Sequence, residues 1–160
     1  MASAYGRRTE RLTMQAAIFI GIQASGKTEF YRRRFFDTHV RINLDMLKTR
    51  HREAVLLRAC LEAKQPFVVD NTNPTVDERA KYISAAREAG FRVVGYFFQS
   101  KLAQSLERNE QRALSQRVPR VGVLGTFNRL QLPSLAEGFD ALFFVSLRPP
   151  ADFSVEEWRS

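Results

Sequence analysis

The stretch Gly21-Ile22-Gln23-Ala24-Ser25-Gly26-Lys27-Thr28 decides the fold of this 160-residue chain. It satisfies the pattern G-x-x-x-x-G-K-[ST] at every constrained position. The residues before it, 15–20, are Gln-Ala-Ala-Ile-Phe-Ile and predict a short buried strand, whereas residues 28–36 predict a helix. This order of strand, loop and helix is the setting in which the pattern forms a P-loop, and it argues against a chance glycine turn.

A P-loop binds the phosphates of a nucleotide through the free backbone N–H groups at a helix N-terminus. We expect Lys27 to reach the β- and γ-phosphates, and the Thr28 hydroxyl to help hold Mg²⁺. The predicted cofactors are therefore ATP and Mg²⁺. The predicted nucleotide-binding residues of the loop are Gly21, Ile22, Gln23, Ala24, Ser25, Gly26, Lys27 and Thr28.

The composition indicates one globular domain without a membrane segment. Hydrophobic residues make up 44% of the chain, and no apolar run approaches the roughly 20 residues that a bilayer crossing needs. The N-terminus lacks the apolar segment of a signal peptide, and Cys60 is the only cysteine, so no disulfide framework is expected. We expect an intracellular, cytoplasmic protein.

The charge is strongly positive, with 25 Lys and Arg against 17 Asp and Glu and a net charge of +8. Such an excess suits a polyanionic partner such as nucleic acid. It is equally consistent with an enzyme that is basic because it holds a triphosphate. Charge alone leaves these two interpretations open.

Strands and helices alternate along the chain. Strands are predicted at 15–20, 40–43, 67–70, 91–98 and 141–145, and helices at 28–36, 45–64, 75–89, 101–114 and 120–130. Continuous apolar strands separated by helices indicate a parallel sheet covered on both faces. We therefore predict an α/β, three-layer P-loop fold with a parallel five-stranded sheet, with ligands at the carboxyl ends of the strands. The predicted organisation is a flexible tail over 1–14, a domain over 15–148 and a C-terminal tail over 149–160.

Two acidic residues and one lysine follow predicted strands. Asp70 ends an apolar strand, where a carboxylate can complete the magnesium site of Thr28, or can stabilise the turn that follows. Asp45 follows the second strand, where it can take a proton from an attacking hydroxyl or cap the next helix. Lys48, one helical turn further, can bind a substrate phosphate or be a solvated helix charge.

Arg108 and Arg112 lie four residues apart and share one face of the predicted helix 101–114. Arginines on a lid can stabilise the charge of a transferring phosphoryl group. Their spacing by itself favours a solvated basic face.

Taken together, these segments resemble the kinase domain of phage and animal polynucleotide 5′-hydroxyl kinases, over about residues 15–145. More distantly, they resemble the zeta-toxin kinases, which phosphorylate a nucleotide sugar. The resemblance is carried by an ordered set: the P-loop, Asn43-Leu44-Asp45, Val69-Asp70-Asn71-Thr72-Asn73-Pro74, Glu107-Arg108-Asn109-Glu110-Gln111-Arg112, Val118-Pro119 and Leu135-Ala136-Glu137-Gly138-Phe139.

The resemblance implies a kinase domain over 15–148 with a helical lid at about 101–130. It implies that Asp45 is the general base for a 5′-hydroxyl, that Asp70 is required, and that Arg112 contacts the donor phosphates with Arg108 nearby. The position of Lys48 is usually an arginine that binds the acceptor's phosphate. Lys48 keeps the charge but loses the bidentate fork, and the loop lacks the Pro-Gly pair frequent in that family.

The first hypothesis is an ATP-dependent kinase that phosphorylates the 5′-hydroxyl of a polynucleotide end. A P-loop kinase for a small acceptor, such as a sugar, nucleoside, nucleotide sugar or antibiotic, is the second. The third is a nucleotide-binding switch with little turnover. The base Asp45 separates the third hypothesis from the other two, because a switch needs no base at that position.

Overall fold

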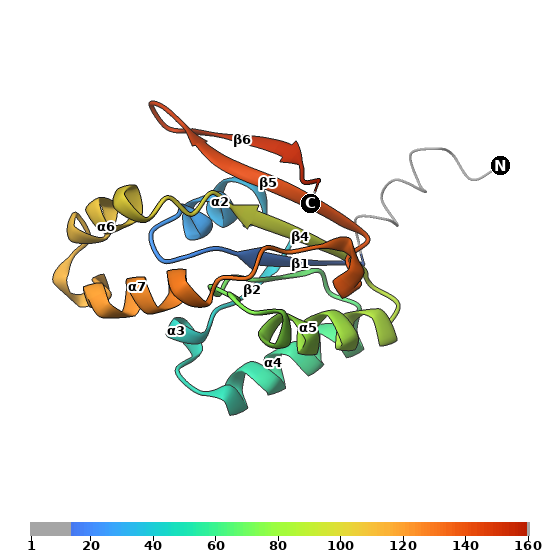
Figure 1. The fold of residues 1–160 in the computed structure, drawn as a ribbon. Helices are drawn as coiled ribbons and strands as arrows, with labels where there is room; N and C mark the ends of the chain where they lie inside the picture. The colour runs from blue at the N-terminus through green and yellow to red at the C-terminus, as the bar shows by residue number, and fades with distance from the viewer. Residues whose placement is uncertain (1–13, 160) are drawn as a thin grey trace.

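Six β-strands form a single sheet in the computed structural model, which describes residues 14–159 (Figure 1). In sheet order they are β2 (Val40–Ile42), β3 (Phe67–Val69), β1 (Gln15–Ile20), β4 (Arg92–Phe98), β5 (Ala141–Arg148) and β6 (Asp152–Glu157). The first five are mutually parallel, and β6 pairs antiparallel with β5. The predicted α/β P-loop fold is confirmed, with one strand more than the five expected.

Helices cover both faces of this sheet. α2 (Lys27–Arg34) lies on one face, whereas α4 (Arg50–Ala63) and α5 (Val76–Glu88) lie on the other (Figure 1). At the end toward which the parallel strands point are α3 (Leu44–Leu47), α6 (Leu102–Glu110) and α7 (Arg120–Arg129). The 3₁₀ turn η1 (Leu114–Gln116) joins α6 to α7, and η2 (Leu135–Glu137) precedes β5.

The side chains of β1 alternate between two hydrophobic cores, one on each face of the sheet. Phe19 packs with Phe30 of α2, at 5.7 Å between ring centroids, whereas Ile18 and Ile20 pack toward α5. Every residue of β1 is buried. β1 lies between two parallel strands, and helices cover both of its faces. Both sets of alternating side chains are therefore buried, which explains why its sequence is apolar almost throughout.

Three expectations about secondary structure were wrong. The predicted helix 101–114 ends at Glu110 as α6, so Arg112 lies beyond it and does not share a helical face with Arg108. Residues 45–64 do not form one helix: α3 ends at Lys48, whose φ is 72°, and α4 begins after a new cap at Thr49. The expected C-terminal tail, 149–160, contains β6, in which Phe153 and Val155 alternate with polar residues. Its antiparallel pairing with β5 depends on a partner strand and not on local sequence. The expected N-terminal tail lies outside the described residues, apart from Met14.

Residues 14–159 contain no helix with the length and apolar character that crossing a membrane requires.

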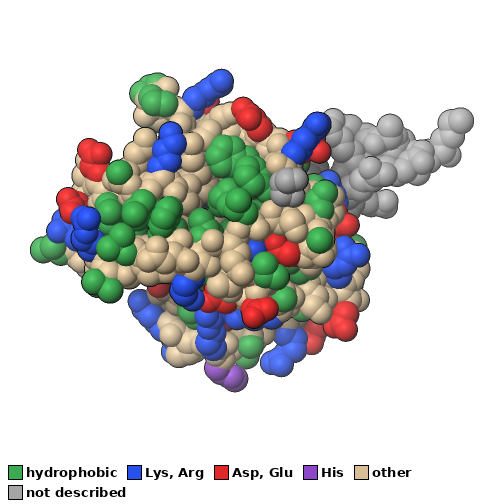
Figure 2. All heavy atoms as spheres, in the orientation of Figure 1, with side chains coloured by type: hydrophobic (Ala, Val, Ile, Leu, Met, Phe, Trp, Pro, Cys, Tyr) green, Lys and Arg blue, Asp and Glu red, His purple; other side chains and the backbone are tan. Residues whose placement is uncertain are grey.

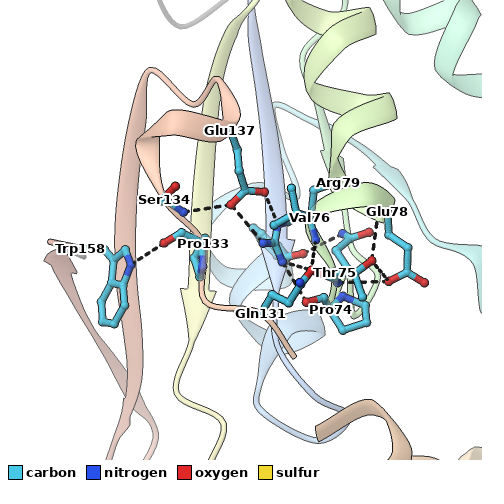
Figure 3. Close-up of polar contacts among 12 residues, drawn as sticks. Pro74, Thr75, Val76, Glu78, Arg79, Gln131, Pro133, Ser134, Glu137 and Trp158 are labelled. Atoms are coloured by element: carbon cyan, nitrogen blue, oxygen red, sulfur yellow. Dashed lines mark hydrogen bonds and ion pairs between the residues drawn. The ribbon is translucent and has the colours of Figure 1, made fainter. Parts of the chain in front are cut away.

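A buried ion pair fastens α5 to the segment before β5 (Figure 3). Arg79, with no exposed side-chain surface, donates to both carboxylate oxygens of Glu137 at 2.7 and 3.0 Å. Arg79 also donates to the carbonyl oxygens of Asn73 and Pro74, and Glu137 accepts from the Ser134 N–H at 3.0 Å. The pair therefore joins residues 73–79 to residues 134–137, two segments that lie far apart in the sequence.

We expect Glu137→Gln to lower the free energy of unfolding by about 3–5 kcal/mol, because it leaves the buried guanidinium of Arg79 without a counter-charge. Urea denaturation followed by circular dichroism measures this. Arg129→Gln is the control, since its pair with Glu78 is exposed and should contribute less than about 1 kcal/mol. Equal losses in the two variants would contradict the assignment of stability to the buried pair.

Candidate active site

The loop between β1 and α2 is shaped by left-handed backbone at two positions. The φ angle is 97° at Gly26 and 59° at Ala24. A Cβ atom at position 26 would lie 3.2 Å from Phe153 of β6 and 3.3 Å from Leu147 of β5. Glycine is therefore required at position 26 both for its backbone conformation and for the close approach of the β5–β6 hairpin.

Lys27 is folded back onto the loop that carries it. Its amine donates to the carbonyl oxygens of Gly21 and Ile22 at 3.0 and 2.7 Å, and to the Ser25 hydroxyl at 3.3 Å. Burial lowers the pKa of Lys27 to about 8, against a partial opposing effect of the Asp70 carboxylate. The Lys27 amine already lies at the N-terminus of a helix, where phosphates bind. It can therefore exchange these oxygens for phosphate oxygens without a change in the backbone of the loop.

The predicted metal ligands, Thr28 and Asp70, are in contact. The Thr28 hydroxyl donates to Asp70 Oδ2 at 3.1 Å, and the Asp70 side chain is only 1% exposed. Their third partner, Arg41, was not predicted from the sequence, and its Nε donates to the same carboxylate oxygen at 2.8 Å. The signal was a charged residue in the middle of the three-residue strand β2, but nothing local shows where its side chain is directed.

Asp45 is placed by two asparagines at the strand ends. The Asn43 side chain caps the first turn of α3 and also donates to the carbonyl oxygen of Asp70 at 2.5 Å. The Asn71 side chain accepts the N–H of Leu44 at 2.9 Å. The start of α3 is thus fixed to the end of β3, and the exposed carboxylate of Asp45 lines the same cleft as Lys27.

Lys48 does not share this position. It ends α3 with left-handed backbone, is exposed, and is not among the residues that line the cleft. Because α3 ends at Leu47, the helical spacing between Asp45 and Lys48 does not continue through Lys48. Its role as a substrate-phosphate ligand stays a prediction.

A buried carboxylate that sequence analysis missed lies below the cleft. Glu53 accepts hydrogen bonds from the Tyr82 hydroxyl at 3.0 Å, from Arg50 at 3.1 Å and from Asn71 at 3.3 Å. Burial alone would raise the pKa of Glu53, but the hydrogen bonds from Tyr82 and Arg50 and the charge of Lys81 hold it below its usual range. Glu53 therefore keeps Arg50 and Lys81 at the wall of the cleft, which both residues line.

The lid, which comprises α6, η1 and α7, is bound directly to the P-loop. Arg108 of α6 donates to the Ala24 carbonyl oxygen at 2.6 Å, and Gln23 donates to the Thr126 hydroxyl of α7 at 3.0 Å. Burial lowers the pKa of Arg108. Arg112 lines the cleft, and its positive charge contributes to the lowered pKa of Lys27. The structure thus brings both predicted lid arginines to the P-loop.

These residues enclose a cleft of about 340 Å³ between the P-loop, the strand ends and the lid. The predicted site residues that line it are Gln23, Ala24, Lys27, Thr28, Asp45, Asp70 and Arg112. Further polar residues of the wall are Asn43, Arg50, Asn71, Thr72, Asn73, Glu78, Lys81, Tyr82 and Gln116. Basic side chains thus meet in the cleft with two carboxylates at the strand ends.

The side chains present fit one kind of metal ion. Within residues 14–159, no group of three or more His, Cys, Asp or Glu side chains could by itself hold a metal. A hydroxyl and a carboxylate, as in Thr28 and Asp70, are hard oxygen donors that suit Mg²⁺ when a nucleotide supplies further oxygens. The pair therefore fits a metal that arrives with a nucleotide.

A family model described as "AAA domain" matches residues 17–131, which include the P-loop, both strand-end carboxylates and the lid. The chain belongs to this AAA domain family. A curated relative of this AAA domain is the bifunctional polynucleotide phosphatase/kinase of Schizosaccharomyces pombe, which is 26% identical over 129 residues. That alignment covers 78% of this chain but 32% of the relative, so this chain spans about a third of its length.

Solved structures share the α/β P-loop kinase fold with this AAA domain. Kti12 of Chaetomium thermophilum, in complex with ADP-AlF3, superposes with a TM-score of 0.65 at 16% identity, over 82% of this chain and 88% of Kti12. A gluconokinase from Sinorhizobium meliloti superposes with a TM-score of 0.61 at 17% identity, over 86% and 85% of the two chains. At these identities the likeness concerns the fold.

We expect nucleotide affinity to fall as the pH rises above about 8, the pKa of Lys27 in the free protein. Phosphate oxygens favour the charged amine, so above pH 8 binding requires the uptake of a proton, and affinity should fall by up to about tenfold per pH unit. Calorimetry with ADP between pH 6.5 and 9.5, in buffers of different ionisation enthalpy, measures the affinity and the proton uptake. Lys27→Met should bind weakly at all pH values and take up no proton. A wild-type affinity that does not change over this range would contradict the expectation.

Proposed function

We propose that this protein is a kinase that uses ATP and Mg²⁺ to phosphorylate the 5′-hydroxyl of a polynucleotide end. The observation that carries the proposal is the meeting of Lys27, Arg112 and Asp45 in one cleft. Two cations there can accept the charge of a transferring phosphoryl group, and the carboxylate of Asp45, beyond the carboxyl end of β2, can accept a proton.

In the proposed reaction, the acceptor hydroxyl oxygen forms a bond to the γ-phosphorus of ATP, and the bond from that phosphorus to the β-bridging oxygen breaks, which releases ADP. The hydroxyl proton passes to Asp45. Lys27 and Arg112 neutralise the equatorial and leaving oxygens. Bound at Thr28 and Asp70, Mg²⁺ would neutralise further negative charge on the phosphates. Arg108 keeps the left-handed turn at Ala24 in place and so positions the loop.

A polynucleotide acceptor is supported by the wall of the cleft beyond Asp45. Arg50 and Lys81 line it and are held there by Glu53. Two cations in the cleft that also contains Asp45 suit an acceptor with a phosphate close to its free hydroxyl. The similarity to the S. pombe polynucleotide phosphatase/kinase covers 78% of this chain and supports the same acceptor class.

The net charge of the protein adds little support for a polynucleotide acceptor. Figure 2 shows Lys and Arg side chains spread over the displayed face and interspersed with Asp and Glu, not gathered in one continuous patch. On this face the positive charge supports general attraction of anions, and the proposed recognition uses the cations inside the cleft.

A small-molecule acceptor is the second candidate, supported by the cleft's limited volume of about 340 Å³ and its partial cover by the lid. A phosphorylated nucleoside or a sugar would fit the same base and phosphate ligands. The S. meliloti gluconokinase has this fold but, at 17% identity, it gives no preference for a sugar over a nucleic-acid end.

We expect the protein to transfer label from γ-labelled ATP to 5′-hydroxyl DNA or RNA oligonucleotides, and Asp45→Asn to lower the rate by about 10²–10⁴-fold, because the amide cannot accept the proton. Gel separation of the oligonucleotides measures this. The control is Asp37→Asn, which removes the same charge from an exposed position outside the cleft and should keep full activity.

The same assay includes 3′-mononucleotides and a panel of sugars, nucleosides and antibiotics. Label on a small metabolite with none on oligonucleotides would replace the first candidate by the second. Asp45→Asn as active as the wild-type protein would show that Asp45 is not the base, and absence of transfer to every acceptor would favour a nucleotide-binding switch.

We also expect oligonucleotide affinity to fall steeply with salt concentration, and Lys81→Gln to reduce the slope of log K against log salt by about 0.7–1. Fluorescence anisotropy of a labelled 5′-hydroxyl oligonucleotide between 50 and 300 mM salt, as approximate limits, measures the slope. Arg92→Gln is the control, because Arg92 begins β4 at the opposite end of the strands. An unchanged slope in Lys81→Gln would remove Lys81 from the acceptor site.

A further inference from the structure

Arg41 occupies the half-site at which sequence analysis places the metal. Its Nε donates to Asp70 Oδ2 at 2.8 Å, and its terminal nitrogen donates to the Thr28 hydroxyl oxygen at 3.3 Å. The Thr28 hydroxyl in turn donates to Asp70 Oδ2 at 3.1 Å. The three side chains therefore form a closed triangle of hydrogen bonds around one carboxylate oxygen.

The fold explains why Arg41 reaches this position. Ile42 of β2 packs into the core on the α4 and α5 face, so Arg41, one residue earlier, lies on the face covered by α2. There the Tyr31 ring of α2 lies 6.0 Å from the guanidinium, and Asp70 follows the neighbouring strand β3. The Asp70 side chain is 1% exposed but that of Arg41 is 23% exposed, so Arg41 has an open side toward which it can withdraw.

The triangle uses the groups that a magnesium ion would need. The Thr28 hydroxyl gives its proton to Asp70 and accepts an N–H from Arg41, so one of the two lone pairs on its oxygen is engaged. Asp70 Oδ2 already accepts two hydrogen bonds. A guanidinium also stays protonated at any physiological pH, so loss of a proton does not relieve the competition.

We propose that Arg41 is a resident counter-cation of Asp70 that competes with Mg²⁺ for this half-site, so that nucleotide binding by the wild-type protein depends weakly on Mg²⁺. The inference rests on the proposed nucleotide binding at the P-loop. In the free protein Arg41 neutralises Asp70 and keeps its carboxylate directed at Thr28. When Mg²⁺ arrives with a nucleotide, like-charge repulsion displaces Arg41 toward solvent. Arg41 is thus a positioning residue that sets the magnesium requirement.

The test measures ADP binding by calorimetry over a series of free Mg²⁺ concentrations, including EDTA. For Arg41→Gln we expect the half-saturating Mg²⁺ concentration to fall by about tenfold or more. This fall corresponds to the loss of one charge-assisted hydrogen bond, from Arg41 to Asp70, with which Mg²⁺ competes. In EDTA the same variant should bind ADP more weakly than wild type, because a positive charge is gone. Arg41→Lys, a point charge without the fork, should give an intermediate value.

Arg32→Gln is the matched control. It removes an arginine of α2 whose side chain is 67% exposed and which, within residues 14–159, pairs with Glu29, so its magnesium dependence should equal that of the wild-type protein. Equal half-saturating Mg²⁺ in wild type, Arg41→Gln and Arg41→Lys, with ADP binding intact, would overturn the inference.

Thermal unfolding supplies a second readout that does not need a nucleotide. Arg41→Gln leaves the buried Asp70 charge unpaired, so it should melt at a lower temperature, and MgCl2 should restore part of the loss when compared with NaCl of equal ionic strength. The melting temperature of the wild-type protein should be the same in MgCl2 as in NaCl of equal ionic strength. If ADP fails to bind wild type at any Mg²⁺ concentration, the proposed nucleotide binding fails, and the melting data alone decide on Arg41. If MgCl2 shifted the melting temperatures of wild type and Arg41→Gln equally, the proposed competition between Arg41 and Mg²⁺ would be contradicted.

Discussion

Asp70 is the point on which the arrangement of this site depends. Its N–H donates to the carbonyl oxygen of Ile42 at 2.8 Å, its own carbonyl oxygen accepts from Asn43, and its carboxylate accepts from Thr28 and Arg41. One buried residue thus joins the ends of β2 and β3 to the beginnings of α2 and α3. A buried carboxylate is stable only when charged and hydrogen-bonded partners surround it. Among these partners, Thr28 is also a proposed magnesium ligand, and Asn43 caps the helix that carries Asp45.

The lid and the P-loop form one connected unit in this structure. Arg108 binds the Ala24 carbonyl oxygen and Gln23 binds Thr126, so both lid helices contact the turn that would hold phosphates. The β5–β6 hairpin packs against the same turn at Gly26 from the other side. Since the loop is supported from two sides, its left-handed positions persist without a ligand, which is the preorganisation that electrostatic catalysis needs.

The sequence predicted the local elements more completely than their partners. A helix was predicted at 75–89, and the structure contains α5 there, begun by a capping box of Thr75 and Glu78. The break at Lys48 was missed because every residue from 45 to 64 tolerates a helix, and only the capping contacts of Asn43 and Thr49 divide it. From the sequence, Glu53 is one of several charged residues on an amphipathic helix, and nothing local predicts its burial. It is buried beside Tyr82 and Asn71 because α4 packs against α5 and the end of β3.

By itself, the sequence determined the P-loop, the alternation of strands and helices and the two carboxylates that follow strands, because these depend on residue type and short spacing. Only the tertiary structure decided which cations meet those carboxylates. Arg41 on β2, Arg50 on α4, Lys81 on α5 and Arg112 on the lid lie up to 71 residues apart in the chain, and they share one site. The physical reason is the parallel sheet, which brings strand ends that are distant in sequence to one edge. Long side chains from different elements can contact one another at that edge.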